Sequence, residues 1–138
     1  KFLKDIGVAN ADRGFAQVDV LSYESTAAPG IHVIGDASAT TQPKAGHIGN
    51  QEGKVCADAI LRIFAGGAPD PAPVTNSSCY SPITLSSASW LTAVYAYDPV
   101  SRAMQVVPGA SGEARSANKD HYEDMFVWFR TLMRDTFA

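Results

Sequence analysis

A run of glycine and proline residues near the middle of the chain limits what the segments on either side of it can form. The run reads "GGAPDPAP" and holds Gly66, Gly67, Pro69, Pro71 and Pro73. A glycine pair supplies a helix C-cap, and prolines forbid the continuation of a helix. A helix that leads into this run must therefore end at it. We expect the chain to consist of two parts, residues 1–67 and residues 68–138.

The segment before the run has the pattern of an amphipathic helix. Apolar residues recur at steps of three and four, while polar residues fall mainly on the other faces. The apolar positions are Ile48, Val55, Cys56, Ala59, Ile60, Ile63 and Phe64. This spacing predicts a helix that begins near residue 48 or 49 and ends at the glycine pair. Because Cys56 lies on the apolar stripe, we interpret it as a packing residue.

Residues 17–36 have the pattern of a strand, a turn and a second strand. In "QVDVLSY" apolar and polar residues alternate, which is the period of a half-buried strand. "ESTAAPG" supplies turn residues, and "IHVIGDA" is a short β-branched run that stops at Gly35. A continuous apolar run of this kind fits a buried strand of a parallel sheet.

The second part of the chain predicts a loop, two strands and a helix. Residues 68–87 are interpreted as a loop. "SWLTAVYAYDP" is rich in aromatic and β-branched residues, and "AMQVVPG" is its expected antiparallel partner beyond a turn at Asp98. From Asp120 to Thr136, apolar residues form one broad helical stripe. The expected fold class is therefore α+β: the end of an α/β domain, then a small domain with an antiparallel strand pair and a closing helix.

Charge and composition exclude several classes of protein. The net charge is -3 and only 18% of the residues are charged, so the chain lacks the basic surface that binds nucleic acid. No apolar run approaches the roughly 20 residues that span a bilayer. Two cysteines in 138 residues fit neither a disulfide scaffold nor a zinc ribbon. The start "KFLKDIGVAN" lacks an initiator Met and a signal-peptide pattern, so we expect a mature or excised piece of a longer protein.

The segment around Asp36 is the strongest candidate for a binding site. A carboxylate at the end of a buried parallel strand lies where α/β folds bind ligands. Gly35 allows a ligand close to the backbone, and Asp36 can accept hydrogen bonds from sugar-like hydroxyls. The helix that follows directs its first amides, at residues 46–50, toward the same crevice, where they stabilise negative charge. A plain turn, with Asp36 capping a backbone amide, explains the same residues equally well.

The order of several motifs resembles a known family. "PGIHVIGDAS" resembles the second flavin-binding motif of the flavoprotein disulfide reductase superfamily, which has two dinucleotide-binding domains. "QPKAGHIGNQEGKVCADAI", "NSSCYSPIT" and "WFRTLMRDTFA" narrow the resemblance to the flavin subunit of flavocytochrome c sulfide dehydrogenase. The resemblance covers essentially all of the chain, but only about the C-terminal third of such a subunit. It implies FAD as cofactor, oxidation of sulfide, and transfer of electrons to a c-type haem subunit in the periplasm.

The resemblance also assigns roles to residues of the flavin site. It implies that Asp36, beside Gly35, binds the ribityl chain of FAD. Lys44, Ala45 and Gly46 match the region that faces the pyrimidine end of the flavin, where a positive charge and helix amides favour the anionic reduced form. On its own residues, Lys44 is equally well a solvated surface lysine.

Three further residues match the sulfur-handling side of the family. Cys79 matches one cysteine of a redox disulfide, and the resemblance places the other cysteine upstream of Lys1. From the sequence alone, the favoured interpretation of Cys79 is a small buried residue or a partner of Cys56, and the resemblance reverses this preference. Trp128 matches a family aromatic near the flavin and the sulfide pocket, although a core tryptophan on an amphipathic helix is the alternative. Tyr80 follows Cys79 directly and is expected to line the same site. His47 is interpreted as packing or solvent-facing.

The chain lacks parts that a complete enzyme of this family needs. It has no G-x-G-x-x-G turn for the FAD pyrophosphate and no C-x-x-C-H haem motif. We therefore expect the isolated 138 residues to bind FAD weakly or not at all and to have no turnover. Two alternatives stay open. Residues 88–107 and 120–136 could form a docking module for a cytochrome or a second copy, or the chain could be part of a sulfide:quinone or NADH:quinone reductase.

Overall fold

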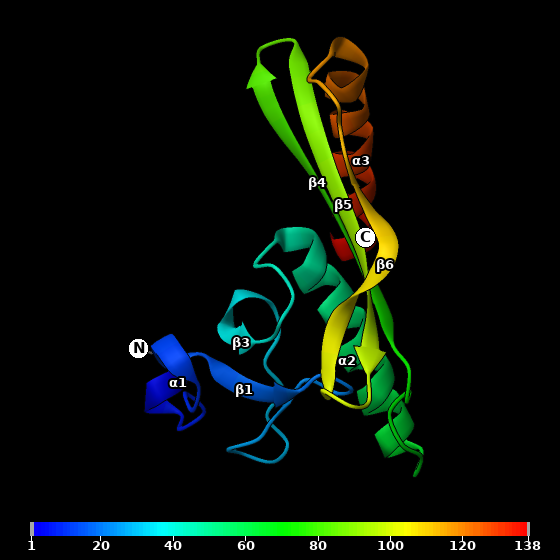
Figure 1. The fold of residues 1–138 in the computed structure, drawn as a ribbon. Helices are drawn as coiled ribbons and strands as arrows, with labels where there is room; N and C mark the ends of the chain where they lie inside the picture. The colour runs from blue at the N-terminus through cyan, green and yellow to red at the C-terminus, as the bar shows by residue number, and fades with distance from the viewer. Residues whose placement is uncertain (1, 138) are drawn as a thin grey trace.

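The computed structural model describes residues 2–137 and shows a mixed α+β chain with two separate three-stranded sheets (Figure 1). The first part holds short elements: α1 (Phe2–Asp5), η1 (Asp12–Gly14), β1 (Ala16–Asp19), β2 (Glu24–Ser25), η2 (Gly35–Ala37) and β3 (Ser38–Ala39). The longer elements follow: α2 (Gly46–Phe64), β4 (Val74–Thr84), β5 (Ser87–Asp98), β6 (Ala103–Glu113) and α3 (Lys119–Phe137). The expected α+β class is confirmed.

The first sheet is small and mixed, with the strand order β2-β1-β3. β1 pairs antiparallel with β2 and parallel with β3. The prediction of a sheet strand at Ile31–Gly35 is wrong. This segment makes one isolated bridge, between His32 and Glu24, and one further backbone bond from the Val33 amide to the Tyr23 carbonyl at 2.9 Å. At Gly35 the backbone takes φ +66° and leaves the extended conformation, so the segment forms no longer ladder with a neighbouring strand.

The second sheet is antiparallel with the order β4-β5-β6. The strands 87–98 and 103–113 confirm the pair expected from the sequence. The loop expected at residues 68–87 is wrong over most of its length, because residues 74–84 form β4. This strand pairs with β5 from Val74, opposite Ala96, to Pro82, opposite Ala88. Pro82 fits because β4 lies at the edge of the sheet, where a missing N–H leaves no ladder bond open.

The two long helices agree with the sequence. α2 begins two residues before the expected start and ends just before the glycine pair. The amides of Ala65, Gly66 and Gly67 close its last turn on carbonyls of residues 61–63, and Gly66 takes φ +78°. α3 covers the expected final segment and is capped by Asn118, whose Oδ1 accepts the His121 amide at 2.8 Å. Within residues 2–137, neither helix nor any shorter one has the length and apolar character that a bilayer crossing requires.

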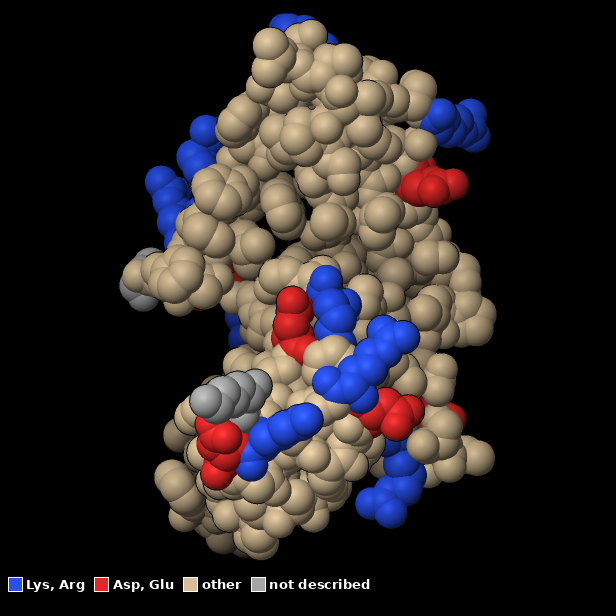
Figure 2. All heavy atoms as spheres, turned by 90° about the vertical axis from the view of Figure 1, so that its left-hand side faces the viewer, with Lys and Arg blue, Asp and Glu red and all other residues tan. Residues whose placement is uncertain are grey.

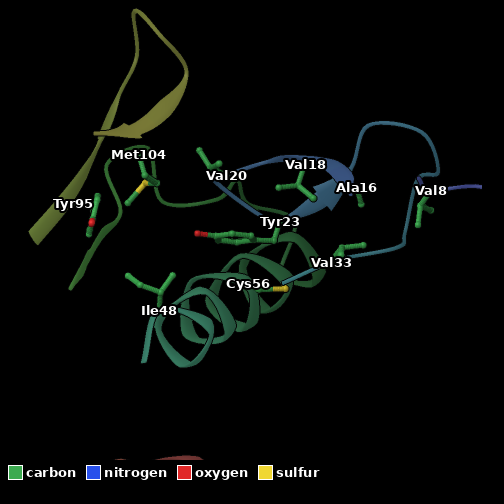
Figure 3. Packing of buried hydrophobic residues seen from close by; sticks show 10 residues of the cluster. All are labelled: Val8, Ala16, Val18, Val20, Tyr23, Val33, Ile48, Cys56, Tyr95 and Met104. Atoms are coloured by element: carbon green, nitrogen blue, oxygen red, sulfur yellow. The ribbon is translucent and has the colours of Figure 1, made fainter. Parts of the chain in front are cut away.

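One hydrophobic core joins the first sheet, α2 and the lower end of the second sheet (Figure 3). Tyr23 is fully buried at its centre, and its hydroxyl donates to Oε1 of Gln42 at 3.1 Å. The amide of Gln42 donates in turn to Thr75 of β4 at 2.6 Å. Cys56 points into this cluster and confirms its assignment as a packing residue. Buried members of the cluster are Val8, Ala16, Val18, Val20, Tyr23, Val33, Ile48, Cys56, Tyr95 and Met104.

The upper part of the second sheet extends beyond this core and carries α3 on one face (Figure 1). Tyr80 and Trp90 are opposite each other in the β4–β5 register and share the face toward α3. Tyr80 packs on Trp128 with ring centroids 5.6 Å apart, and Trp90 packs on His121 at 6.1 Å. Because side chains alternate along a strand, residues 79 and 91 lie on the other face. Leu91 is 52% exposed there.

Candidate functional site

The Gly35–Asp36 turn presents an exposed carboxylate. Gly35 has φ +66°, a conformation that L side chains rarely adopt, and a side chain at this position would meet open space. Asp36 follows in η2 and is exposed. Its carboxylate makes neither a hydrogen bond nor an ion pair with any residue between 2 and 137, so it does not cap a backbone amide as the turn interpretation required. It is available to accept hydrogen bonds from a ligand.

The N-terminus of α2 lies next to this turn and is uncapped. Ala45 is the N-cap and supplies no side-chain hydrogen bond, and the first intrahelical bond runs from the Gly49 amide to the Ala45 carbonyl at 3.0 Å. The first turn holds no acidic residue. A side chain added at Gly46 would meet nothing within 4 Å. The helix therefore offers amides and a partial positive charge at an open surface.

Lys44 is exposed but fixed in place. Its ammonium donates to the Ser38 carbonyl and lies 5.0 Å from the centre of the Phe15 ring. This anchors a positive charge beside the Gly35–Asp36 turn, which a freely solvated lysine would not do. Lys44 also lines a cavity of about 620 Å³ between the first sheet and the β5–β6 turn, with Thr40, Thr41 and Arg102 on its wall.

Cys79 lies in β4 and not in the irregular loop that the sequence suggested. It is half-buried, and neither Cys79 nor Cys56 forms a disulfide within the described chain. The register places Cys79 opposite Leu91, on the face that α3 does not cover. Ser77 shares this face, and its hydroxyl is buried without a hydrogen-bond partner among residues 2–137. This hydroxyl, two residues from Cys79 on the same face, can hydrogen-bond to a ligand or to a neighbouring segment.

His47 connects the α2 N-terminus to the strand that carries the cysteine. Its Nδ1 accepts the backbone amide of Ser78, the residue before Cys79, at 3.0 Å. On the other side of α2, a side chain at Gly49 would lie 3.5 Å from the Cα of Gly35, so helix and turn pack backbone to backbone. α2 thus brings the Gly35–Asp36 turn, its own N-terminus and Cys79 into one region. Sequence patterns did not indicate this role for His47.

Trp128 and Tyr80 lie beside this region, on the α3 side of the sheet. The Trp128 ring is 6.3 Å from His47 in an edge arrangement, and its indole N–H is buried without a partner within the described chain. Burial raises the pKa of Tyr80, and the charge of Asp124 acts in the same direction. Trp128 and His47 also line a groove of about 350 Å³ between α2 and α3. Their assignment to a substrate pocket stays a prediction.

The surface around the cysteine carries almost no charge. Residues 71–97, which include all of β4 and nearly all of β5, hold no Lys, Arg, Asp or Glu. Figure 2 shows that the centre of the upper part of this side of the molecule is free of charged side chains, with charged groups only at its edges, whereas the lower part carries several of both signs. Such a surface has no charged side chain that could pair with a bound ion. It suits an aromatic cofactor or an apolar neighbour.

Glu52 is a part of the site that sequence patterns missed. It is 1% exposed and accepts the Gly35 amide at 2.5 Å. Burial raises the pKa of its carboxyl, whereas the Gly35 amide, the charge of Lys44 and two hydroxyls act against this rise. A signal was present, because residue 52 stands four residues after Ile48 and four before Cys56, on the apolar stripe.

The donors and acceptors of this region fit a flavin dinucleotide. Asp36 offers a carboxylate to hydroxyl groups, as the ribityl chain carries, and the α2 N-terminus offers amides to carbonyl oxygens, as the pyrimidine ring carries. A half-buried cysteine, Cys79, lies on an uncharged face in the same region.

A comparison with family models identifies the family of the second part. Residues 71–137, just under half of the chain, match the model described as flavocytochrome c sulphide dehydrogenase, flavin-binding. Residues 71–137 are therefore similar to the flavin-binding part of that family, which points to FAD as the cofactor. The match includes Cys79, Tyr80 and Trp128, while Asp36 and Lys44 lie before it.

Proposed function

We propose that the chain forms the flavin-facing part of a sulfide dehydrogenase subunit that oxidises sulfide and passes the electrons to a c-type cytochrome. The observation that carries the proposal is the hydrogen bond between His47 and Ser78. It joins the strand of Cys79, inside the family match, to the helix that follows Asp36. Bound FAD supplies a two-electron acceptor to this site.

The first part of the chain has the role of holding and orienting the cofactor. Asp36 accepts hydrogen bonds from the ribityl hydroxyls, and Gly35 leaves room for them next to the backbone. The amides at the start of α2, with Ala45 and Gly46, face the pyrimidine end together with the ammonium of Lys44. Positive charge at that end favours the reduced, anionic state and so favours acceptance of electrons.

Cys79 forms a redox disulfide with a second cysteine outside these 138 residues. Hydrosulfide attacks one sulfur of such a disulfide, the S–S bond breaks, and the attacked cysteine becomes a persulfide while the other leaves as a thiolate. Cys56 cannot be the second cysteine without unfolding, because it is 8% exposed and packs in the core. Cys79 is half-buried and forms no disulfide within the described chain, and Leu91, opposite it on the same face, is 52% exposed, so another segment can reach this part of the sheet.

Tyr80 and Trp128, proposed as aromatic residues of the sulfide pocket, pack on the α3 face of the sheet, opposite the face of Cys79. Their packing against each other and against His47 excludes water from the α3 face and so supports the strand that carries Cys79. The uncharged surface of residues 71–97 and the description of the matching family as a flavocytochrome c support a c-type cytochrome as the partner. The proposed compartment is the periplasm. The isolated 138 residues are expected to show no turnover, since a site for the FAD pyrophosphate is absent from them.

The proposal is tested by replacing Cys79 in the whole flavoprotein. Cys79→Ser removes the sulfur with little change in volume, and we expect sulfide-dependent flavin reduction in stopped-flow absorbance to slow by at least about 100-fold. The matched control is Cys56→Ser, which changes the other cysteine in the core. It is expected to lower stability while the reduction rate of the folded protein stays near that of the parent. An unchanged rate in Cys79→Ser contradicts the catalytic role.

A further inference from the structure

Glu52 carries the one buried carboxyl group among residues 2–137, and the function proposed above does not use it. Its residue is 1% exposed, in the first half of α2. Glutamate is almost never buried in this way unless its carboxylate is paired or hydrogen-bonded, because removal of a charge from water is costly. No cation lies within ion-pair distance of Glu52 among residues 2–137, so hydrogen bonds must stabilise it.

All of the hydrogen-bond partners of Glu52 come from one short segment, residues 35–40. Oε2 accepts the Gly35 amide at 2.5 Å and faces the Ser38 hydroxyl at 3.5 Å. Oε1 accepts the Thr40 hydroxyl at 3.4 Å. A carboxylate accepts hydrogen bonds and donates none, so an ionised Glu52 matches these donors. The segment they come from is the turn that carries Asp36.

The backbone of α2 is shaped to let this carboxylate reach the turn. Gly49 and Gly53 flank Glu52 along the same helix. A side chain at Gly49 would contact the Cα of Gly35 at 3.5 Å, and one at Gly53 would contact Cδ1 of Ile34 at the same distance. Helix and turn therefore lie in contact at both positions, and the Glu52 side chain bonds to the turn between them.

Two further bonds extend the connection toward the positive charge of the site. The Ser38 hydroxyl donates to the Gly35 carbonyl at 2.8 Å, and the Lys44 ammonium donates to the Ser38 carbonyl. Both peptide groups of Gly35 are thereby held, its amide by Glu52 and its carbonyl by Ser38. The conformation of the Gly35–Asp36 turn is set from behind, while the Asp36 carboxylate stays exposed in front.

We infer that Glu52 is the positioning residue of the flavin turn: its buried carboxylate holds Gly35, and through it Asp36, and places a fixed negative charge behind the cofactor. This inference rests on the proposed role of Asp36 in binding FAD. Two consequences follow. Loss of the acceptor frees the turn and weakens FAD binding, and loss of the charge alone makes the flavin easier to reduce, because the added electrons no longer approach a negative group.

The test compares two substitutions of Glu52 in the whole flavoprotein. In Glu52→Gln, the amide oxygen still accepts from Gly35 and the amide nitrogen turns to the Thr40 hydroxyl, so the bond is kept and the charge is lost. In Glu52→Met, a side chain of similar length keeps neither. We expect FAD affinity, measured by flavin fluorescence on rebinding to apoprotein, to fall at least about tenfold in Glu52→Met, as loss of a buried bond to a charged group predicts. Glu52→Gln is expected to stay within about threefold of the parent and to have a more positive flavin midpoint potential.

Two controls separate this inference from the proposed function. Glu123→Gln removes an exposed carboxylate on α3 and is expected to change neither affinity nor potential. Asp36→Asn tests the ligand itself. If Asp36→Asn leaves FAD affinity unchanged, the assignment of Asp36 fails, whatever Glu52 does. If Asp36→Asn weakens binding and folded Glu52→Met binds FAD like the parent, the positioning role of Glu52 is overturned. Should Glu52→Met yield no folded apoprotein by circular dichroism, Glu52→Gln decides: a raised potential supports the inference, and an unchanged potential rejects it.

Discussion

Buried polar side chains connect the elements of this protein more directly than its apolar contacts do. Tyr23 illustrates this at the scale of one residue, because it is fully buried and still donates a hydrogen bond to Gln42. Gln42 passes the connection to Thr75, so a chain of three polar side chains links the first sheet to β4 across the core. Glu52 makes the corresponding link between α2 and the Gly35–Asp36 turn. The link through Tyr23 and Gln42 has no periodic signal in the sequence, whereas Glu52 stands on the apolar stripe of α2.

The burial of Tyr23 predicts a loss of stability at alkaline pH. Burial, helped by the charges of Glu52 and Cys56, raises the pKa of its hydroxyl far above the ordinary value of 10.0. Above pH 10 the unfolded chain therefore loses this proton while the folded chain keeps it, and the free energy of unfolding falls by up to about 1.4 kcal/mol per pH unit. Tyr23→Phe removes the titrating group and costs about 1–2 kcal/mol at neutral pH through the unpaired Gln42 oxygen.

Urea unfolding at pH 8 and pH 10.5 measures both effects. We expect the parent to lose more stability between these values than Tyr23→Phe does. Tyr122 on α3 is half-buried and lies outside the core cluster, so Tyr122→Phe serves as the matched control and should retain the full pH dependence. Equal losses in the parent and Tyr23→Phe would show that another group is responsible.

At the scale of elements, the sequence predicted what has a period and missed what does not. The apolar stripes of α2 and α3 and the β-branched run of β5 are regular, and the structure confirms all three. β4 was missed because "TNSSCYSP" is polar on both faces. It becomes a strand only because β5 lies beside it to accept its backbone bonds. Ile31–Gly35 shows the reverse error, since an apolar run without a neighbouring strand along its length makes only one isolated bridge among the described residues.

The residues of the candidate site divide in the same way. Asp36 and Cys79 were predicted from motifs, whereas the parts of His47 and Glu52 depend on contacts between segments that are distant in the sequence.

The cap of α3 gives a prediction at this scale. Asn118 accepts the His121 amide with its side chain and pairs with Ala88 of β5 through its backbone. Asn118→Ala removes the first bond and keeps the second, and we expect a cost of about 1 kcal/mol in the free energy of unfolding. Asn118→Asp keeps an oxygen acceptor at the same place and is the matched control, expected to stay near the parent. Chemical denaturation followed by circular dichroism measures both, and equal stabilities for the two variants would contradict the capping role.

At the scale of the whole molecule, the division expected at residues 67 and 68 coincides with the glycine–proline run but not with a break in the core. Tyr95 and Met104 of the second sheet belong to the same buried cluster as Tyr23 and Ile48. The Thr41 hydroxyl also donates to the Met104 carbonyl at 2.5 Å. The upper sheet with α3 extends away from this cluster (Figure 1). The two parts therefore have separate sheets, but they share one buried core.

A shared core predicts that both parts unfold together. Met104 is 1% exposed and lies on β6, so Met104→Ala opens a cavity between the two sheets and is expected to cost about 2–5 kcal/mol. The loss should appear equally in probes of each part. Fluorescence of Trp90 and Trp128 reports on the second part, and hydrogen exchange at the amides of α2 reports on the first. Val106→Ala is the matched control, since Val106 is on the same strand, is 48% exposed and is expected to cost well under 1 kcal/mol. If Met104→Ala lowered the tryptophan transition alone and left the exchange of α2 unchanged, the two parts would be independent domains and the core would not couple them.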